Sequence, residues 1–296
     1  MSDVLVGLIG GTGLGDALRA EAGGKAKSVE VETPFGKPSA PILMTDVGGQ
    51  PVAILARHGI GHRFNPSEVP YRANLFALKK LGVTHILASG ATGILREAIK
   101  PRDLVISDQV IDKTLRHGRT FFDDFVVHVE FAHPFCECLR RHLITAGKSL
   151  AVTVHPEGTY ICMEGPQFST RAESLMHRAW GGDLIGMTAM PEAKLAREAE
   201  ICYASIGIPT DYDCWRQAEP GMAADQVLAM ILANLQAGTA NAVELVKRAV
   251  PGLAKAVRDD CPCRHALARA IWTDRKVIDP KAVEKLAPIV GKYLTF

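Results

Sequence analysis

The chain has 296 residues, 47% hydrophobic and 22% charged, which is ordinary for a globular enzyme with a sizeable core. Its 34 basic and 32 acidic residues give a net charge of +2, so neither a nucleic-acid ligand nor an anionic membrane is indicated. The N-terminus lacks a basic region before a long apolar run, and the apolar run 227–233 is too short to cross a bilayer. We therefore predict a cytoplasmic protein whose seven cysteines are reduced and mostly buried.

A first buried strand is predicted over residues 4–9, and it ends in the glycine-rich turn 10–13. Glycines let backbone N–H groups approach an anion closely, and Thr12 adds a hydroxyl, so the turn resembles a phosphate-binding loop. A dinucleotide-binding fingerprint would need its third glycine where the chain has Asp16, and no long P-loop motif is present. A tight turn without a ligand is the alternative, and this motif taken alone favours it.

Two further strands, 42–46 and 52–56, form a predicted hairpin. The second strand runs into Arg57 and His58, which open a segment rich in arginine and histidine that ends at residue 63. Arginine supplies a planar fork of donors for phosphate, and histidine can donate to an oxyanion. A solvated loop with a basic bias explains the same residues equally well.

A helix over 67–80 and a strand over 84–88 are predicted next, and the strand leads into a small-residue loop, 89–93, that contains Gly90 and Ala91. This loop, the glycine turn, the arginine–histidine segment and Thr188 can converge on one anion. Each of these signals is weak alone, and an anion-binding site is indicated by their occurrence together.

The middle of the chain predicts strands at 104–106, 110–111, 151–154 and 159–163, and helices at 134–147 and 171–180. His128 lies in this part, where a lone histidine is more often structural than catalytic. Thr170 and Glu173 can form a capping box at the second helix. Glu164 and Phe168 just before it are harder to explain by capping, since an acid can accept from sugar hydroxyls and a base can stack on a ring.

The segment 184–213 predicts a strand, a helix from 191 to about 206 and a second extended segment, which together suggest a parallel crossover. Ligands of open α/β sheets bind beyond the carboxyl ends of strands. Those ends are predicted at Met187–Thr188 and at Asp211–Tyr212–Asp213. Two acids and a hydroxyl at strand ends form a candidate site.

Three helices are predicted in the remainder, at 224–250, 262–272 and 280–293, the first ending at Pro251. We therefore predict an α/β fold with one domain, residues 1–250, and a helical C-terminal extension, residues 251–296, packed on the same domain. Cys261–Pro262–Cys263 invites a zinc interpretation, and Cys136–Glu137–Cys138 is the nearest comparable motif. Free thiols are the favoured state, a disulfide within the C-x-C motif comes second and a metal third, so no metal site is predicted.

Several of these motifs together resemble the trimeric purine nucleoside phosphorylase family, and within it the branch that cleaves S-methyl-5'-thioadenosine. The matching segments are 10–13, 33–36, 55–59, 164–169, 187–188, 191–192 and 210–215. The matching segments occur in the same order as in the family, from about residue 5 to about residue 235. Their combination is highly specific, unlike any single segment. It implies a mixed, largely parallel central sheet flanked by helices. It also implies that phosphate attacks C1' of the nucleoside, giving adenine and 5-methylthioribose 1-phosphate in purine and methionine salvage.

By this resemblance inorganic phosphate is a co-substrate, and no metal or organic cofactor is needed. Thr12, Arg57, His58, Ala91 and Thr188 would hold the phosphate, and Gly90 would do so through its backbone alone, where the adenosine-type enzymes usually carry a hydroxyl residue. Met187 would lie against the ribose, with Phe168 and Ser169 near the base. His128 would come from a neighbouring subunit of a homotrimer, or of a dimer of trimers.

The implied reaction needs a general acid that protonates the leaving purine. The leaving purine must be protonated at N7, and Asp211, with a raised pKa, is the candidate. Tyr212 and Asp213 complete the base site, where an acceptor of the 6-amino group favours adenine. Ala224, with Met222 and Val227, forms either an apolar pocket for the 5' group or helix core.

Three alternatives remain open. A 6-oxopurine or methylthioinosine phosphorylase would keep the fold and the mechanism, although the two acids argue against it. A Rossmann-type nicotinamide-dependent oxidoreductase is suggested by the glycine turn alone, and a non-catalytic nucleoside-binding protein is the least specific option.

The region beyond Pro251 resembles an extension of thermophilic family members, in which disulfides occur.

Overall fold

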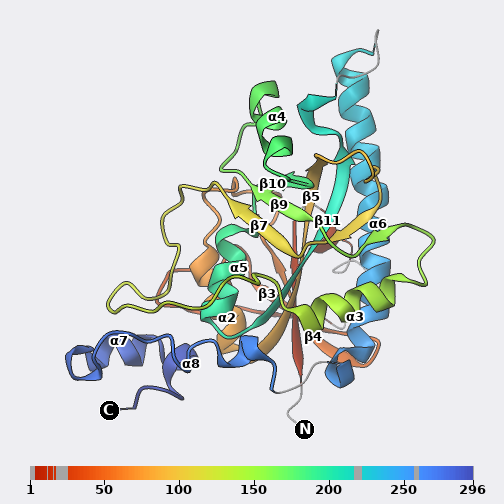
Figure 1. Cartoon of the computed structure of the whole chain (residues 1–296). Coiled ribbons are helices and arrows are strands. Elements are labelled where there is room, and N and C mark those ends of the chain that lie inside the picture. Colours follow the sequence, from red (N-terminus) through yellow and green to blue (C-terminus); the bar gives the residue numbers. More distant parts are fainter. Residues whose placement is uncertain are drawn as a thin grey trace.

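The computed structural model describes residues 4–11, 13–15, 17, 26–216, 222–256 and 260–295. An 11-stranded mixed sheet runs through the molecule, and a separate apolar cluster packs on each of its faces (Figure 1). One cluster lies between the sheet and helices α2 (Tyr71–Lys80) and α5 (Ala189–Glu198). The other lies beneath α3 (Glu137–Gly147) and α6 (Ala224–Ala256). The predicted α/β class, with a mixed and largely parallel sheet, is confirmed.

The N-terminal strands form one wing of the sheet. β3 (Ile42–Val47) and β4 (Gln50–Ala56) pair as the predicted antiparallel hairpin, and β2 (Lys27–Val29) adds to its outer edge. β1 (Leu5–Gly10) lies between β4 and β5 and is parallel to both. The carboxyl ends of β1 and β4 therefore point to the same edge of the sheet.

β5 (Val83–Ile94) is the central strand and is longer than predicted. The small-residue segment 89–93 continues this strand and is not a loop, so that prediction was wrong. β11 (Cys202–Asp211) runs parallel along the whole segment, and β10 (Leu184–Gly186) pairs antiparallel with its end. Because neighbouring strands satisfy its backbone groups, glycine and alanine do not break the strand here.

The predicted parallel crossover is also wrong. α5 ends at Glu198, whereas the sequence pattern extended it to about residue 206, and β11 already begins at Cys202. β10 is antiparallel to β5 and β11 is parallel to it, so the two strands run in opposite directions. β11 is buried on both faces along nearly all of its length. Such a strand shows no alternation, and its apolar positions matched helical spacing by chance.

The remaining elements complete the far wing of the sheet and its cover. The strands are β6 (Leu104–Ile106), β7 (Gln109–Asp112), β8 (Val154–His155) and β9 (Thr159–Cys162). α4 (Arg171–Ala179) begins with the predicted capping box of Thr170 and Glu173, which is confirmed. α6 does not stop at Pro251 but continues to Ala256, because its second half packs against the sheet through buried residues such as Val250 and Leu253.

The C-terminal segment after α6 is helical but broken into short pieces. They are η3 (Pro262–His265), η4 (Arg275–Val277), α7 (Pro280–Lys285) and α8 (Ala287–Val290). The predicted helices 262–272 and 280–293 were therefore too long. The segment shares one apolar cluster with α2 and α5, and α8 packs on α2 (Figure 1). The buried Glu200 carboxylate accepts hydrogen bonds from the Leu267 N–H at 2.9 Å and the Tyr293 hydroxyl at 2.6 Å.

Within the described ranges, no helix combines the length and the apolar character needed to span a bilayer.

Candidate active site

The ends of β1 and β4 meet the middle of β5 and form one side of the candidate site, here called the phosphate side after the role that the resemblance implies. Gly10 pairs with Ala56, and the residue before it pairs with Ala88 of β5. The Arg57 backbone N–H donates to the Gly10 carbonyl at 3.0 Å, and the Gly11 N–H donates to the Ser89 carbonyl at 3.3 Å. Sheet register thus brings the glycine turn, the arginine–histidine segment and β5 together. Thr12 itself lies outside the described residues.

Arg57 is the buried cation of this site. Its Nε and Nη2 each donate to one Glu192 carboxylate oxygen at 2.8 Å, and its Nη1 donates to the Ser89 carbonyl at 2.7 Å. The Tyr203 hydroxyl donates to the same carboxylate at 2.7 Å. Burial alone would lower the pKa of Arg57, but the Glu192 charge outweighs it and raises the pKa above its ordinary value. A guanidinium has five N–H donors, so two remain for an anion once these three bonds are made.

Gly11 packs closely against that buried guanidinium. A Cβ at Gly11 would lie 3.3 Å from Nη1 of Arg57, so a longer side chain would press against the cation. The glycine turn therefore has a steric reason connected with the cation beside it. A tight turn without a ligand and an anion-binding turn both account for this proximity.

His58 lies next to Arg57 and is held by its own loop. Its Nδ1 is 2.9 Å from the Phe64 carbonyl, which can only accept, so the proton is on Nδ1. The ring stacks on His62 with centroids 4.3 Å apart. Burial, followed by the Arg57 charge, lowers the pKa of His58 to about 4. The neutral ring therefore offers an acceptor at Nε2, and the expected donation from His58 to an oxyanion would require protonation of that nitrogen.

The pKa of His58 gives an expected pH dependence. Between its unfolded value of 6.5 and its folded value of about 4, the unfolded chain binds more protons, so the stability of the ligand-free protein should fall as the pH falls through this window. Thermal unfolding at about pH 7 and about pH 5 measures this effect. His58→Asn keeps a donor for Phe64 but does not titrate, so its melting temperature should depend less on pH. Equal slopes for the two proteins would contradict the assignment.

Thr188 and Gly90 face each other across the phosphate side. Thr188 occupies the N-cap position of α5, and its side chain makes no capping hydrogen bond. A Cβ built on Gly90 would lie 3.4 Å from the Thr188 Oγ1, which is an ordinary contact. Ala91, one position further along β5, is exposed. The Thr188 side chain is instead hydrogen-bonded to Tyr160, and the helix N-terminus beside it favours an anion.

The base side of the candidate site lies at the end of β11. Asp211 Oδ1 accepts from the Thr210 hydroxyl at 2.6 Å, and its Oδ2 accepts from the Asp213 N–H at 3.1 Å. Burial, with a contribution from the Asp213 charge, raises the pKa of Asp211 above its ordinary value. Among the described residues, Oδ2 of Asp213 is buried without a hydrogen-bond partner. The pair thus offers a carboxyl poised to hold a proton and a carboxylate oxygen free to accept.

Aromatic and thiol contacts connect this end of the site to the turn before α4. Tyr212 packs edge-to-face on Trp215, with ring centroids 5.8 Å apart. The Cys214 thiol donates to the Ser169 carbonyl at 3.2 Å. Phe168 beside it is 83% exposed, so its ring is free to cover a flat ligand.

Met187 and Glu164 lie between the two sides. The Met187 sulfur fills the space above Gly165, where a Cβ would be 2.5 Å away. Both carboxylate oxygens of Glu164 are already engaged, one by the Ser67 hydroxyl and one by the Leu115 N–H at 2.7 Å. Glu164 therefore ties loops together in this structure, which differs from the sugar-binding role considered from the sequence.

Two predicted residues lie on the surface. Ala224 begins α6 and is exposed, so it is not packed core, which leaves the pocket interpretation of this residue. His128 is also exposed, and its ring packs edge-to-face on Trp272, with centroids 4.9 Å apart.

Sequence reasoning missed Glu192, Ser89 and Tyr203, which position Arg57. Glu192 was treated only as part of a motif at the start of a helix, where an acid is expected anyway. Its complete burial, at 0% exposure, could not be inferred from spacing, because the partner lies 135 positions away.

Comparisons with known proteins show the family to which the chain belongs. Residues 5–251 match the family model described as the phosphorylase superfamily. The chain is 45% identical to the S-methyl-5'-thioadenosine phosphorylase of Geobacter sulfurreducens, over 98% of this chain and 99% of the relative. A crystal structure of a methylthioadenosine phosphorylase from an antarctic soil metagenomic library superposes with a TM-score of 0.86 at 42% identity, over 97% of this chain and 99% of the other. The corresponding Schistosoma mansoni enzyme in complex with adenine gives 0.82 at 37% identity, over 90% and 99%. The chain belongs to the phosphorylase superfamily and, within it, to the family of the S-methyl-5'-thioadenosine phosphorylases.

Proposed function

We propose that the chain catalyses phosphorolysis of S-methyl-5'-thioadenosine, giving adenine and 5-methylthioribose 1-phosphate. Apart from membership of the family, the proposal rests on one structural observation. A buried cationic site at Arg57 and a carboxyl with raised pKa at Asp211 flank the same strand, β5. Gly90 on the phosphate side and Gly93, which pairs with Asp211, are three positions apart, or ~10 Å along a strand. A nucleoside with phosphate at C1' can span that distance.

The proposed mechanism divides the work between the two sides. Phosphate held by Arg57, Thr188 and the backbone around Gly90 attacks C1' and also stabilises the positive charge that develops on the sugar. Asp211 donates its proton to N7 as the glycosidic bond breaks, so adenine leaves neutral. The free oxygen of Asp213 accepts from the 6-amino group and favours adenine over a 6-oxopurine. Inorganic phosphate is the co-substrate, and the proposal includes no metal or organic cofactor in this reaction.

Exposed aromatic residues near the base side and beside His128 suggest that a second chain completes the site. Phe168, at 83% exposure, and Trp272, at 71%, are large apolar side chains left open to solvent in the single chain. We infer a homotrimer, or a dimer of trimers, in which the partner contributes His128 to the 5' end of the nucleoside. Light scattering should give three or six times the chain mass of 31.9 kDa. A mass equal to one chain, with full activity, would contradict this arrangement.

The proposed compartment is the cytoplasm, because the described residues include seven cysteines and no disulfide, which suits a reducing environment. The products would then enter purine and methionine salvage.

Base release tests the proposed function directly. We expect adenine release that depends on phosphate and is fastest from methylthioadenosine, compared with adenosine and inosine. Dominant hypoxanthine release from inosine would instead identify a 6-oxopurine phosphorylase with the same fold. Binding of these nucleosides without any base release would support a non-catalytic protein. The oxidoreductase alternative has no further support, because the glycine turn lies within the phosphorylase match.

Gly90 offers a gain-of-contact prediction. Its backbone is outside the left-handed region, and a small side chain fits against Thr188, so Gly90→Ser should fold normally. The added hydroxyl should donate to phosphate and lower the KM for phosphate by about 2- to 10-fold, as one hydrogen bond of typical net strength does. The KM for the nucleoside serves as the internal control and should stay unchanged. A raised KM for phosphate would place the anion elsewhere.

A further inference from the structure

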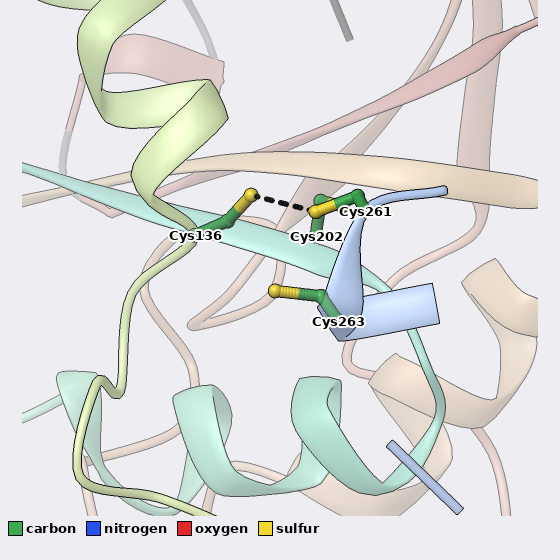
Figure 2. A group of neighbouring side chains, drawn as sticks. All are labelled: Cys136, Cys202, Cys261 and Cys263. Carbon is green, nitrogen blue, oxygen red and sulfur yellow. Dashed lines mark hydrogen bonds between the residues drawn. The ribbon is translucent and has the colours of Figure 1, made fainter. Parts of the chain in front are cut away.

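Four cysteines from three separate parts of the chain meet at one point. Cys136 is the N-cap residue of α3, Cys202 is the first residue of β11, and Cys261 and Cys263 flank the start of η3. All four are buried, and their sulfur atoms lie within 4.8 Å of one another. Figure 2 shows the side chains reaching toward a common space from the three elements.

The spacing of the sulfurs fits a tetrahedral metal centre. The Cys261 sulfur is 3.6 Å from the Cys136 sulfur and 3.6 Å from the Cys202 sulfur. In a zinc–thiolate site with Zn–S bonds of about 2.3 Å, tetrahedral geometry puts neighbouring sulfurs about 3.8 Å apart. A disulfide would require about 2.05 Å, and each disulfide formed would occupy two of the four thiols. The observed arrangement therefore needs only small shifts to enclose an ion.

The chemistry of the donor set also favours a metal. Four sulfur ligands in tetrahedral arrangement select zinc or iron over the harder cations. Cys136 stands at the N-terminus of α3, where the helix dipole favours a negatively charged ligand. Four convergent sulfur atoms, one of them at a helix N-terminus, thus form a donor set suited to zinc.

We propose that Cys136, Cys202, Cys261 and Cys263 form a structural zinc site. Four protein ligands leave no open position, so the ion has no catalytic role. The site lies at the amino end of β11, whereas Asp211 lies at its carboxyl end. Its effect is to fasten the C-terminal segment, through Cys261 and Cys263, to α3 and to the central sheet.

This proposal revises the metal prediction made from the sequence. There the C-x-C motif was paired with Cys136 and Cys138, and a metal ranked below free thiols and a disulfide. Cys138 is half-buried and stands outside the cluster, and Cys202 takes the fourth place. Cys202 was overlooked because it was assigned to the apolar face of a helix.

Metal analysis of the intact protein is the direct test. The protein is produced with zinc in the growth medium, dialysed against EDTA and analysed by inductively coupled plasma mass spectrometry, with one zinc per chain expected. Cys261→Ser should lose the zinc, and Cys138→Ser, the matched neighbour, should retain it. Cobalt(II) refolded into the wild-type protein should show thiolate-to-cobalt charge-transfer bands and the intense visible bands of a tetrahedral site.

Measurements of stability and of activity distinguish the structural role of the zinc from the proposed reaction. Removal of the zinc under denaturing conditions, followed by refolding without metal, should lower the melting temperature, whereas cobalt or zinc restores it. The base-release rate per folded chain should be unchanged, so failure of either proposal is visible without the other. If Cys261→Ser does not fold, the wild-type zinc content and the cobalt spectrum still decide. A chain without zinc, or non-reducing peptide mass spectrometry that finds a disulfide among the four cysteines, would overturn the site.

Discussion

Asp211→Asn is expected to lower kcat/KM for methylthioadenosine and adenosine by about 10²- to 10⁴-fold, the usual contribution of a general acid. The carboxyl is buried at the end of β11 and its pKa is raised, so it can carry the proton that the leaving adenine needs at N7. Asparagine keeps the size and the acceptor for Thr210 but cannot transfer a proton. The wild-type rate should also decline as the pH rises through the pKa of Asp211, and the variant should lack that decline.

Inosine and Asp213→Asn provide the controls for this prediction. Cleavage of inosine should fall much less in Asp211→Asn, because a 6-oxopurine can be stabilised as a leaving group by other hydrogen bonds. Asp213→Asn should change the preference between adenosine and inosine more than it changes kcat, because its free oxygen accepts rather than transfers a proton. If the ratio of kcat/KM for methylthioadenosine and inosine is the same in wild type and Asp211→Asn, Asp211 is not the acid.

Arg57→Ala is expected to have two large effects at once. It removes the principal cation of the phosphate side, so kcat/KM for phosphate should fall by about 10²- to 10³-fold. It also leaves the fully buried Glu192 carboxylate without its partner, and breaking such a pair costs about 3–5 kcal/mol of stability. Urea unfolding and phosphate kinetics measure these effects separately.

A paired replacement shows that the two effects have different origins. Arg57→Met combined with Glu192→Leu removes both charges and keeps the volume, so most of the stability should return. Activity should not return, because no cation faces the phosphate. Recovery of activity in the double variant would mean that Arg57 acts only as a partner for Glu192.

Polar residues at the ends of strands could be located from the sequence, whereas the buried partners that connect them could not. Arg57, His58, Asp211 and Thr188 stand out because charged groups, hydroxyls and glycines follow strands that short-range patterns locate. Glu192 and Cys202 do not stand out, since a buried acid and a buried thiol look like ordinary helix residues until a partner far along the chain is known. Local patterns carry no information about such partners.

The strand assignments failed for a related reason. β11 is buried along nearly all of its length and shows no alternation, and the second half of β5 consists of small residues that are typical of a loop. Pairing with other strands decides where such strands end, as at Gly90 and Gly93 of β5. The register of that pairing, which decides where Arg57 and Asp211 lie, is a property of the assembled sheet.

The sharing of one apolar cluster by α2 and α8 has a consequence for biosynthesis. Ile289 and Val290 belong to the same cluster as Phe76, more than two hundred positions earlier in translation. A ribosome-bound chain therefore exposes an uncovered apolar face on α2 until its last residues leave the exit tunnel. This apolar cluster can therefore be completed only after residues 289 and 290 have left the ribosome.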